Sequence, residues 1–379
     1  MRGSSDGRRL HDARQTHCTE RRHRMLILGA WGWDLEWASA AAAVEQSAGS
    51  EPGRVTAQYR DRWIVQLEGG ASRARITTGS FPGPYPVTGD WVILEKGPGG
   101  NDPVSIVAVL PRRSAIVRGG AGTGTTEQVL AANINVVWIV QGLDTPPNLR
   151  RIERYLAVAW ESGAVPEIVL TKADLAADVV GVGSKVESIA MGVAVRVVSV
   201  QQPESILALR SSLEAGRTIA LLGPSGAGKS TLINALAEEA LAATGTVRES
   251  DRKGRHTTTR RELFQLPCGA LLLDTPGLRE LRVWGLADGL LHAFPDIDEL
   301  AEACRFRDCQ HDVEPGCAVL AAVAAGVLDA DRVQSFRKLR AEAAYAERRS
   351  DPRARASAVA KHKTALKTLK HHPKYRRQD

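Results

Sequence analysis

Short apolar runs alternate with turn residues between residues 54 and 110. The runs are VTAQY, WIVQL, ARITTG, DWVIL and VSIVAVL, and clusters of Gly, Pro and Asp such as FPGPYP and GPGGNDP separate them. Runs of this length that are rich in Val, Ile, Thr and aromatic residues are typical of β-strands. Five short strands so close together predict a small barrel. The five-stranded oligonucleotide-binding barrel is one solution, and other small β folds are alternatives.

Strands alternate with helices after residue 118. Apolar strands are predicted at 134–140, 167–170, 194–200, 218–222 and 270–274, and helices at 148–163, 205–215 and 231–241. This alternation predicts a parallel sheet covered by helices, so we expect an α/β domain over residues 119–288. Beyond about residue 290 the pattern becomes helical.

The two ends of the chain differ in composition from the middle. Residues 31–53 are rich in Ala, Gly and Ser, which predicts a linker or a weak helix, so we expect residues 1–50 to be a disordered extension. The start mimics a signal peptide, but Asp34 and Glu36 interrupt its apolar run, and Met25 is an alternative first residue. Residues 348–379 carry eleven Lys/Arg against two Asp/Glu. A basic tail over 351–379 favours a nucleic-acid or other anionic partner, the alternative being a solvated tail.

Length and cysteine content narrow the class of protein. The 379 residues are enough for two or three domains, and no run of about 20 apolar residues predicts a transmembrane helix. Three of the five cysteines lie between residues 304 and 317. This crowding favours a reducing, cytoplasmic location and a local metal site over a disulfide framework.

A phosphate-binding loop is predicted at GPSGAGKST. Its glycines allow backbone N–H groups to turn towards phosphate oxygens, and the predicted strand before it and helix after it are the context that such a loop requires. Lys229 is expected to reach the β and γ phosphates as a catalytic residue, and the Ser230 hydroxyl to ligate Mg²⁺. The predicted set is Gly223, Pro224, Ser225, Gly226, Ala227, Gly228, Lys229, Ser230 and Thr231.

A guanine clamp is predicted at Thr171, Lys172, Ala173 and Asp174, directly after an apolar strand. A carboxylate at the last position can accept two hydrogen bonds from one edge of guanine, which adenine cannot donate. The clamp comes before the phosphate loop, although it usually follows. Loops at the carboxyl ends of parallel strands face one crevice, so a circularly permuted chain would still bring clamp and phosphate loop together. The alternative is a chance match in an ATPase.

Two further segments predict the parts that sense the γ phosphate. Asp274 and Gly277 of DTPG are expected to act as a Mg²⁺ partner and as a γ-phosphate sensor, and Thr258 or a neighbour in KGRHTTTRREL as the switch ligand. Leu278 occupies the place where a glutamine would orient the attacking water, so we expect slow unaided hydrolysis. His256 is the nearest candidate in the sequence to replace it.

A metal site is predicted from the spacing C-x₄-C-x-H-x₅-C. Its ligands would be Cys304, Cys309, His311 and Cys317. Three thiolates and one imidazole form a closed tetrahedral shell, which indicates one structural Zn²⁺. His292 lies too far upstream to be preferred as the fourth ligand, and unrelated buried cysteines are the alternative.

Several motifs together resemble the ribosome small subunit-dependent GTPase A family. They are LPRRSAIVR, EQVLAANINVVWIV, RYLAVAWESGAVPEIVLTKADL, GPSGAGKSTLINAL, GRHTTTRREL, LLLDTPGLRE and CRFRDCQHDVEPGCAV. The resemblance implies an α/β, circularly permuted GTPase core over 119–288, preceded by a β-barrel over 51–118 and followed by a helical zinc-binding domain over 289–350. It further implies a GTP hydrolase that acts late in assembly of the small ribosomal subunit and contacts its rRNA. We expect this protein to be a cytoplasmic monomer.

Some features depart from the family pattern or leave alternatives open. Thr171 stands where Asn is commoner, and Ser199 could retain part of the base support that a Ser-Ala pair usually gives. Either His256 or the ribosome could supply the water-orienting group. Arg54, Arg60 and Arg62 offer a barrel surface for RNA, with Trp63 either stacking on a base or packing in the core. Two rival functions are a permuted GTPase of large-subunit assembly and a zinc-containing RNA-binding protein with a regulatory nucleotide.

Overall fold

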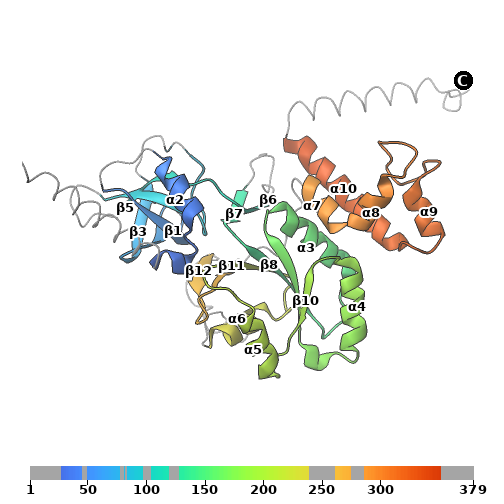
Figure 1. The fold of residues 1–379 in the computed structure, drawn as a ribbon, viewed down its shortest axis with the longest axis horizontal. Helices are drawn as coiled ribbons and strands as arrows, with labels where there is room; N and C mark the ends of the chain where they lie inside the picture. The colour runs from blue at the N-terminus through green and yellow to red at the C-terminus, as the bar shows by residue number, and fades with distance from the viewer. Residues whose placement is uncertain are drawn as a thin grey trace, which may run out of the picture.

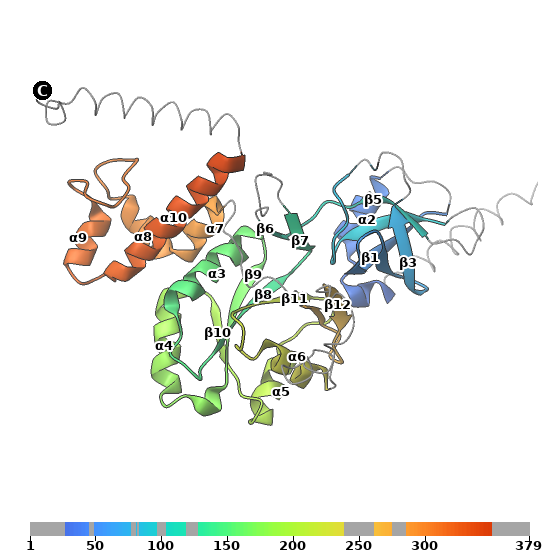
Figure 2. The same cartoon turned by 180° about the vertical axis from the view of Figure 1, so that it is seen from behind.

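The computed structural model describes residues 27–44, 49–76, 81, 83–96, 104–118, 128–238, 261–274 and 286–350. Of Asp274, Ala287 and residues 347–350 it describes only the backbone. A β-barrel and a group of helices lie at opposite ends of a central α/β core (Figures 1 and 2). Across this described part of the chain, no helix has both the length and the apolar composition needed to cross a membrane.

The barrel consists of β1 (Glu51–Gln58), β2 (Trp63–Leu67), β3 (Gly70–Ile76), β4 (Trp91–Glu95) and β5 (Val104–Val109). The strands follow the order β1-β2-β3-β5-β4, and β4 pairs again with β1, which closes the barrel. Alternate side chains such as Val55, Val65 and Ile106 fill its interior. The predicted five-stranded barrel is therefore confirmed. Trp63 is 1% exposed and belongs to this core, so it cannot stack on a base.

The segment before the barrel is folded, contrary to the expectation of a disordered extension. Residues 27–44 contain η1 (Gly29–Trp31) and α2 (Leu35–Ala42), and Asp34 caps α2 by accepting the Trp37 N–H at 2.9 Å. Trp37 packs against Trp91 on the outside of the barrel. The Arg113 guanidinium binds Asp34 with two hydrogen bonds and stacks over the Trp37 ring at 4.1 Å. Apolar packing and the ion pairs of Arg113 with Asp34 and Glu36 thus fix a segment whose composition indicated a linker.

The central sheet is parallel, as predicted. Its strands follow the order β10 (Ala194–Val197), β9 (Val165–Thr171), β8 (Val136–Gly142), β11 (Thr218–Leu222) and β13 (Leu271–Asp274). Alternate strand residues face two cores. One core contains α3 (Leu149–Glu161) and α4 (Val179–Ile189), and the other contains α5 (Pro203–Ser211) and α6 (Lys229–Ala237). This two-faced α/β core confirms the fold class. A hairpin of β6 (Ala115–Arg118) and β7 (Gln128–Ala132) was not predicted.

Strand β12 (Glu262–Gln265) joins the barrel to the central sheet. It runs antiparallel to β13 and pairs with β1 through Ala57 and Glu262, so both domains share one continuous sheet (Figure 1). The sequence did not predict this strand, because it lies within a charged and Thr-rich stretch.

Arg54 of β1 is buried in the same junction, which corrects its expected role in RNA binding. Its side chain is 2% exposed and donates to the Trp31 carbonyl, to the Asn133 carbonyl at 3.1 Å and to the Thr218 hydroxyl at 2.7 Å. Burial lowers the pKa of Arg54 to about 9. These bonds connect the N-terminal segment, the barrel and the central core, so Arg54 is unavailable to an external partner.

The C-terminal helices are α7 (Ala287–Ala293), α8 (Pro295–Ala301), α9 (Ala318–Ala324) and α10 (Ala330–Ser350). Their apolar side chains join the same core as α3, so the C-terminal helices pack directly onto the central α/β core. The expected boundary between residues 288 and 289 falls inside α7.

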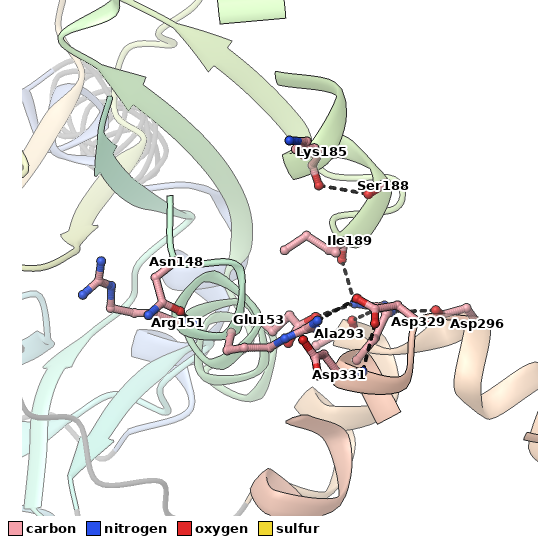
Figure 3. Close-up of polar contacts among 12 residues, drawn as sticks. Asn148, Arg151, Glu153, Lys185, Ser188, Ile189, Ala293, Asp296, Asp329 and Asp331 are labelled. Atoms are coloured by element: carbon pink, nitrogen blue, oxygen red, sulfur yellow. Dashed lines mark hydrogen bonds and ion pairs between the residues drawn. The ribbon is translucent and has the colours of Figure 1, made fainter. Parts of the chain in front are cut away.

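A buried ionic network strengthens this contact (Figure 3). Arg332 of α10 is 3% exposed and donates to both carboxylate oxygens of Asp296 at 2.6 and 2.7 Å. It also donates to Glu153 of α3 at 3.1 Å, and Arg150 donates to the same Glu153 oxygen at 2.7 Å. Glu153 is fully buried, and burial raises its pKa whereas the two arginines lower it. The Ile189 carbonyl at the end of α4 accepts a further bond from Arg332 at 3.3 Å.

Candidate nucleotide site and metal centre

The predicted phosphate loop lies between β11 and α6. Gly223, Gly226 and Gly228 have φ values of 153°, 80° and 88°, which other residues rarely adopt. A Cβ at Gly223 would lie 2.2 Å from the Val140 carbonyl oxygen, so only glycine fits there. Gly228 is the N-cap of α6, which therefore begins at Lys229, two residues earlier than predicted. Unpaired N–H groups at the start of a helix are suited to binding an anion.

Lys229 folds back over this loop. Its ammonium group donates to the Gly223 carbonyl at 2.7 Å and to the Pro224 carbonyl at 2.6 Å. The charge therefore lies at the mouth of the glycine-rich turn, where the loop would surround phosphate oxygens. Ser230 follows in the first turn of α6 and is half-buried.

The predicted clamp meets the phosphate loop through one hydrogen bond. Thr171 ends β9, is 5% exposed, and donates its hydroxyl hydrogen to the Ala227 carbonyl at 2.6 Å. A Cβ on Gly228 would lie 3.1 Å from the same hydroxyl oxygen, so the two loops touch. Thr171 stands where Asn is commoner in the family, and here its hydroxyl reaches the phosphate loop directly.

Asp174 is held in position by Ser199. The Ser199 hydroxyl donates to the Asp174 carboxylate and accepts the backbone N–H of Gln201 at 3.1 Å. Ser199 is 1% exposed whereas Asp174 is exposed, so a buried group orients a carboxylate that faces solvent. The neighbouring N–H of Ala173 donates to the Val198 carbonyl at 3.3 Å, which ties the clamp to the end of β10.

Lys172 lies between these two residues in the left-handed conformation, with φ 58°. Its ammonium group donates to Asp144 at 2.7 Å, and this bond lowers the pKa of Asp144. Asp144 follows β8, whose carboxyl end lies at the same edge of the sheet as the ends of β9 and β11. Three strand ends thus contribute to one site. The sequence did not single out Asp144, although its position four residues after the strand predicted at 134–140 is a usable signal.

The residues predicted to sense the γ phosphate are described only in part. Asp274 is the last residue of β13, which runs parallel to β11, so its backbone lies at the same edge as the phosphate loop. His256, Thr258, Gly277 and Leu278 lie outside the described residues.

The four predicted zinc ligands converge. The ligand atoms of Cys304, Cys309, His311 and Cys317 all lie within 4.8 Å of one another. The Sγ atoms of Cys304 and Cys317 are 3.8 Å apart, and they lie 3.7 and 3.4 Å from His311 Nδ1. Zn–S bonds of about 2.3 Å and Zn–N bonds of about 2.0 Å in a tetrahedron require separations close to these. The residues therefore fit a Zn²⁺ ion bound through Nδ1 of His311.

Burial and local hydrogen bonds set the protonation and the position of the histidine in this cluster. Burial raises the pKa of Cys309 to about 11 and lowers the pKa of His311, so the imidazole is neutral and ready to ligate. Glu314 accepts the N–H groups of Gln310, Asp312 and Val313, which surround the ligand histidine in sequence. These bonds lower the pKa of Glu314 to about 2. Glu314 was not predicted as a positioning residue, and its place three residues after the histidine was the available signal.

Comparison with known proteins agrees with this geometry. The family model described as RsgA GTPase matches residues 109–284. A Streptomyces coelicolor protein named small ribosomal subunit biogenesis GTPase RsgA is 46% identical over 334 residues, which cover 87% of this chain and 90% of that protein. The chain belongs to the RsgA GTPase family. It is therefore a GTPase, and the family resemblance stated from the sequence is confirmed.

A second relative supports the assignment, and two solved structures share the fold. RsgA 1 of Oceanobacillus iheyensis is 44% identical over 305 residues, covering 79% of this chain and 86% of that protein. YjeQ from Thermotoga maritima has a TM-score of 0.58 at 24% identity and covers 76% of this chain and 97% of its own. YloQ, described as a circularly permuted GTPase, has a TM-score of 0.56 at 21% identity, with coverages of 79% and 96%. At these identities the two structures show the fold alone.

Proposed function

We propose that this protein hydrolyses GTP during maturation of the small ribosomal subunit. The observation that carries the proposal is the Thr171–Ala227 hydrogen bond, which joins the guanine clamp to the phosphate loop although the clamp comes first in the chain. The relatives from S. coelicolor and O. iheyensis are both named small ribosomal subunit biogenesis GTPases, which supports the choice of pathway.

In the proposed complex, the clamp recognises the base and the loop binds the phosphates. The Asp174 carboxylate accepts the two N–H groups on one edge of guanine, and Ser199 holds it for that purpose. Lys172 and Ala173 border the base. The phosphate-loop N–H groups surround the phosphates, and Lys229 leaves the Gly223 and Pro224 carbonyls to reach the β and γ phosphates.

Ser230 at the start of α6 and Asp274 at the end of β13 would hold Mg²⁺, which would supply positive charge to offset the charge that develops on the phosphates. Thr258 would complete the ion's protein ligands, and Gly277 would sense the γ phosphate. His256 would orient the attacking water, because Leu278 has no polar group. The bound subunit would stimulate turnover by supplying or positioning the water-orienting group.

The remaining parts place the enzyme on its partner. One structural Zn²⁺ stabilises the C-terminal helices, and the basic tail over residues 351–379 binds rRNA. We expect a cytoplasmic monomer, since the assembling subunit is itself the partner.

GTP turnover measured with and without purified small subunits tests the proposal. We expect slow turnover alone and a clear increase with small subunits, and a smaller one with large subunits. Nucleotide binding without turnover in either mixture would favour the RNA-binding protein with a regulatory nucleotide. Greater stimulation by large subunits would favour the large-subunit rival.

The base preference is tested by Asp174→Asn. An amide cannot accept both guanine N–H groups, but it can donate to the extra carbonyl of xanthine. We therefore expect the variant to lose affinity for GTP and gain affinity for XTP, with no gain for ATP. An unchanged GTP preference would show that Asp174 does not contact the base.

A further inference from the structure

One exposed aromatic side chain lies between two zinc ligands. Phe306 is 41% exposed, and Arg305 and Arg307 on either side of it are also exposed. The other large aromatic residues that are exposed in the described part of the chain are Tyr59, Tyr85 and Tyr345, and none of them has arginine on both sides. A lone exposed apolar residue is ordinary on a protein surface, so the two arginines decide the argument.

The loop carrying Phe306 is fixed at both ends. Cys304 and Cys309 belong to the metal cluster. The Arg305 N–H donates to the Gly316 carbonyl at 3.0 Å, and the Cys309 N–H donates to the Phe306 carbonyl at 3.3 Å. The stem of Arg305 passes over Gly316, where an added Cβ would lie 3.1 Å from the Arg305 Cβ. Because the loop is already ordered, a ligand that binds it loses little affinity to conformational entropy.

The positive charge beside Phe306 contrasts with the net negative charge of the whole domain. Residues 286–350 contain eight Lys/Arg against twelve Asp/Glu, so the domain as a whole is acidic. Three arginines of α10 already have partners: Arg332 on Glu153 and Asp296, Arg337 on Asp312, and Arg340 on the Gln310 carbonyl. Among the residues that the structure describes, no carboxylate lies within ion-pair distance of Arg305 or Arg307. Unneutralised positive charge therefore lies beside the exposed ring.

We propose that Arg305, Phe306 and Arg307 form a contact for unpaired RNA. One base stacks on the Phe306 ring, and the guanidinium groups bind the phosphates on either side of that base. The Arg305 Cζ atom lies over the ring, 5.5 Å from its centroid, so a base can stack on the guanidinium plane or on the other face of the ring. This inference rests on the proposed function, because the RNA is taken to be that of the small ribosomal subunit.

Photocrosslinking identifies the partner. p-Benzoylphenylalanine replaces Phe306, and the protein is irradiated with purified small subunits and a non-hydrolysable GTP analogue. We expect crosslinks to unpaired nucleotides of the rRNA. Crosslinks confined to a ribosomal protein would overturn the proposal.

Affinity measurements separate stacking from apolar packing. Phe306→Ala and Phe306→Leu should weaken subunit binding about five- to 150-fold, the range for loss of one stacked base, while Phe306→Trp should bind like the wild type. Val313→Ala is a matched control, because Val313 is 84% exposed in the same metal-binding loop. Zinc content and turnover without subunits should be unchanged in all four variants.

Two outcomes would contradict the inference in different ways. If Phe306→Leu binds small subunits as tightly as the wild type, an apolar side chain suffices at this position. That result would refute the stacking contact but leave the proposed function intact. A wild-type protein that neither binds small subunits nor is stimulated by them would overturn both proposals.

Discussion

Removal of the Arg332 side chain tests how the zinc-binding helices are attached to the GTPase core. Arg332→Met keeps much of the apolar stem but removes the guanidinium that links Asp296 to Glu153. Asp296 is 18% exposed and can be hydrated, whereas Glu153 is fully buried. Breaking a buried ion pair from one side costs about 3–5 kcal/mol. Arg150 still neutralises Glu153 at 2.7 Å, so we expect the lower end, about 3 kcal/mol.

Chemical denaturation at equilibrium, with hydrogen exchange to localise the change, measures this loss. The destabilisation should appear in α3 and α10. The double variant Arg332→Met with Glu153→Gln should recover part of the lost stability, because the buried carboxylate that lost one of its arginine partners is then replaced by a neutral amide. Arg337→Met is the matched control on the same helix. Its partner Asp312 is 52% exposed, so its loss should cost less than about 1 kcal/mol.

The loss of stability in Arg332→Met should depend on pH, and the pKa of Glu153 determines in which direction. Burial raises the pKa of Glu153, so its contribution to stability is present at low pH and is lost as pH rises through the folded-state pKa. Removing Arg332 removes an influence that lowers this pKa. The stability difference between wild type and Arg332→Met should therefore be smaller at pH 5 than at pH 8. Equal stability of the two proteins, or a double variant no better than the single one, would refute the reasoning.

Three further predictions concern the nucleotide loops, the N-terminal segment and the metal. Thr171→Val removes the hydroxyl that binds the Ala227 carbonyl. Titration with a fluorescent nucleotide should therefore show that GTP and GDP both bind about fivefold more weakly. Unchanged affinity would contradict this. The hydrogen bond from Arg113 lowers the pKa of Asp34, so this pair's contribution to the docking of α2 should be lost as pH falls through that lowered pKa. The loss should appear as a change in tryptophan fluorescence, since Arg113 also stacks on Trp37, and Asp34→Asn should show the same change at neutral pH; an unchanged signal in that variant would contradict this. Removal of Zn²⁺ by a chelator should unfold α8, α9 and the start of α10 while nucleotide binding persists, as far-UV circular dichroism and the same titration would show; retained helicity would argue against a structural ion.

The sequence by itself determined the parts whose geometry depends on a few consecutive residues. The glycines at 223, 226 and 228 specify the turn of the phosphate loop, because their backbone angles are accessible to few other residues. The spacing of Cys304, Cys309, His311 and Cys317 brings four ligands together within fourteen residues. The strand pattern and the clamp motif predicted a permuted α/β core, because parallel strand ends share one edge of a sheet whatever their order in the chain.

Only the tertiary structure decided which polar residues are buried. Arg54 resembled a surface cation, but its partner Thr218 lies 164 residues away, and Arg332 meets Glu153 across 179 residues. The pairing of β12 with β1, and the docking of α2 on Trp91, likewise join segments that carry no local sign of each other. The physical reason is that burial depends on what the rest of the chain places around a side chain, whereas a turn or a ligand spacing is set by its immediate neighbours.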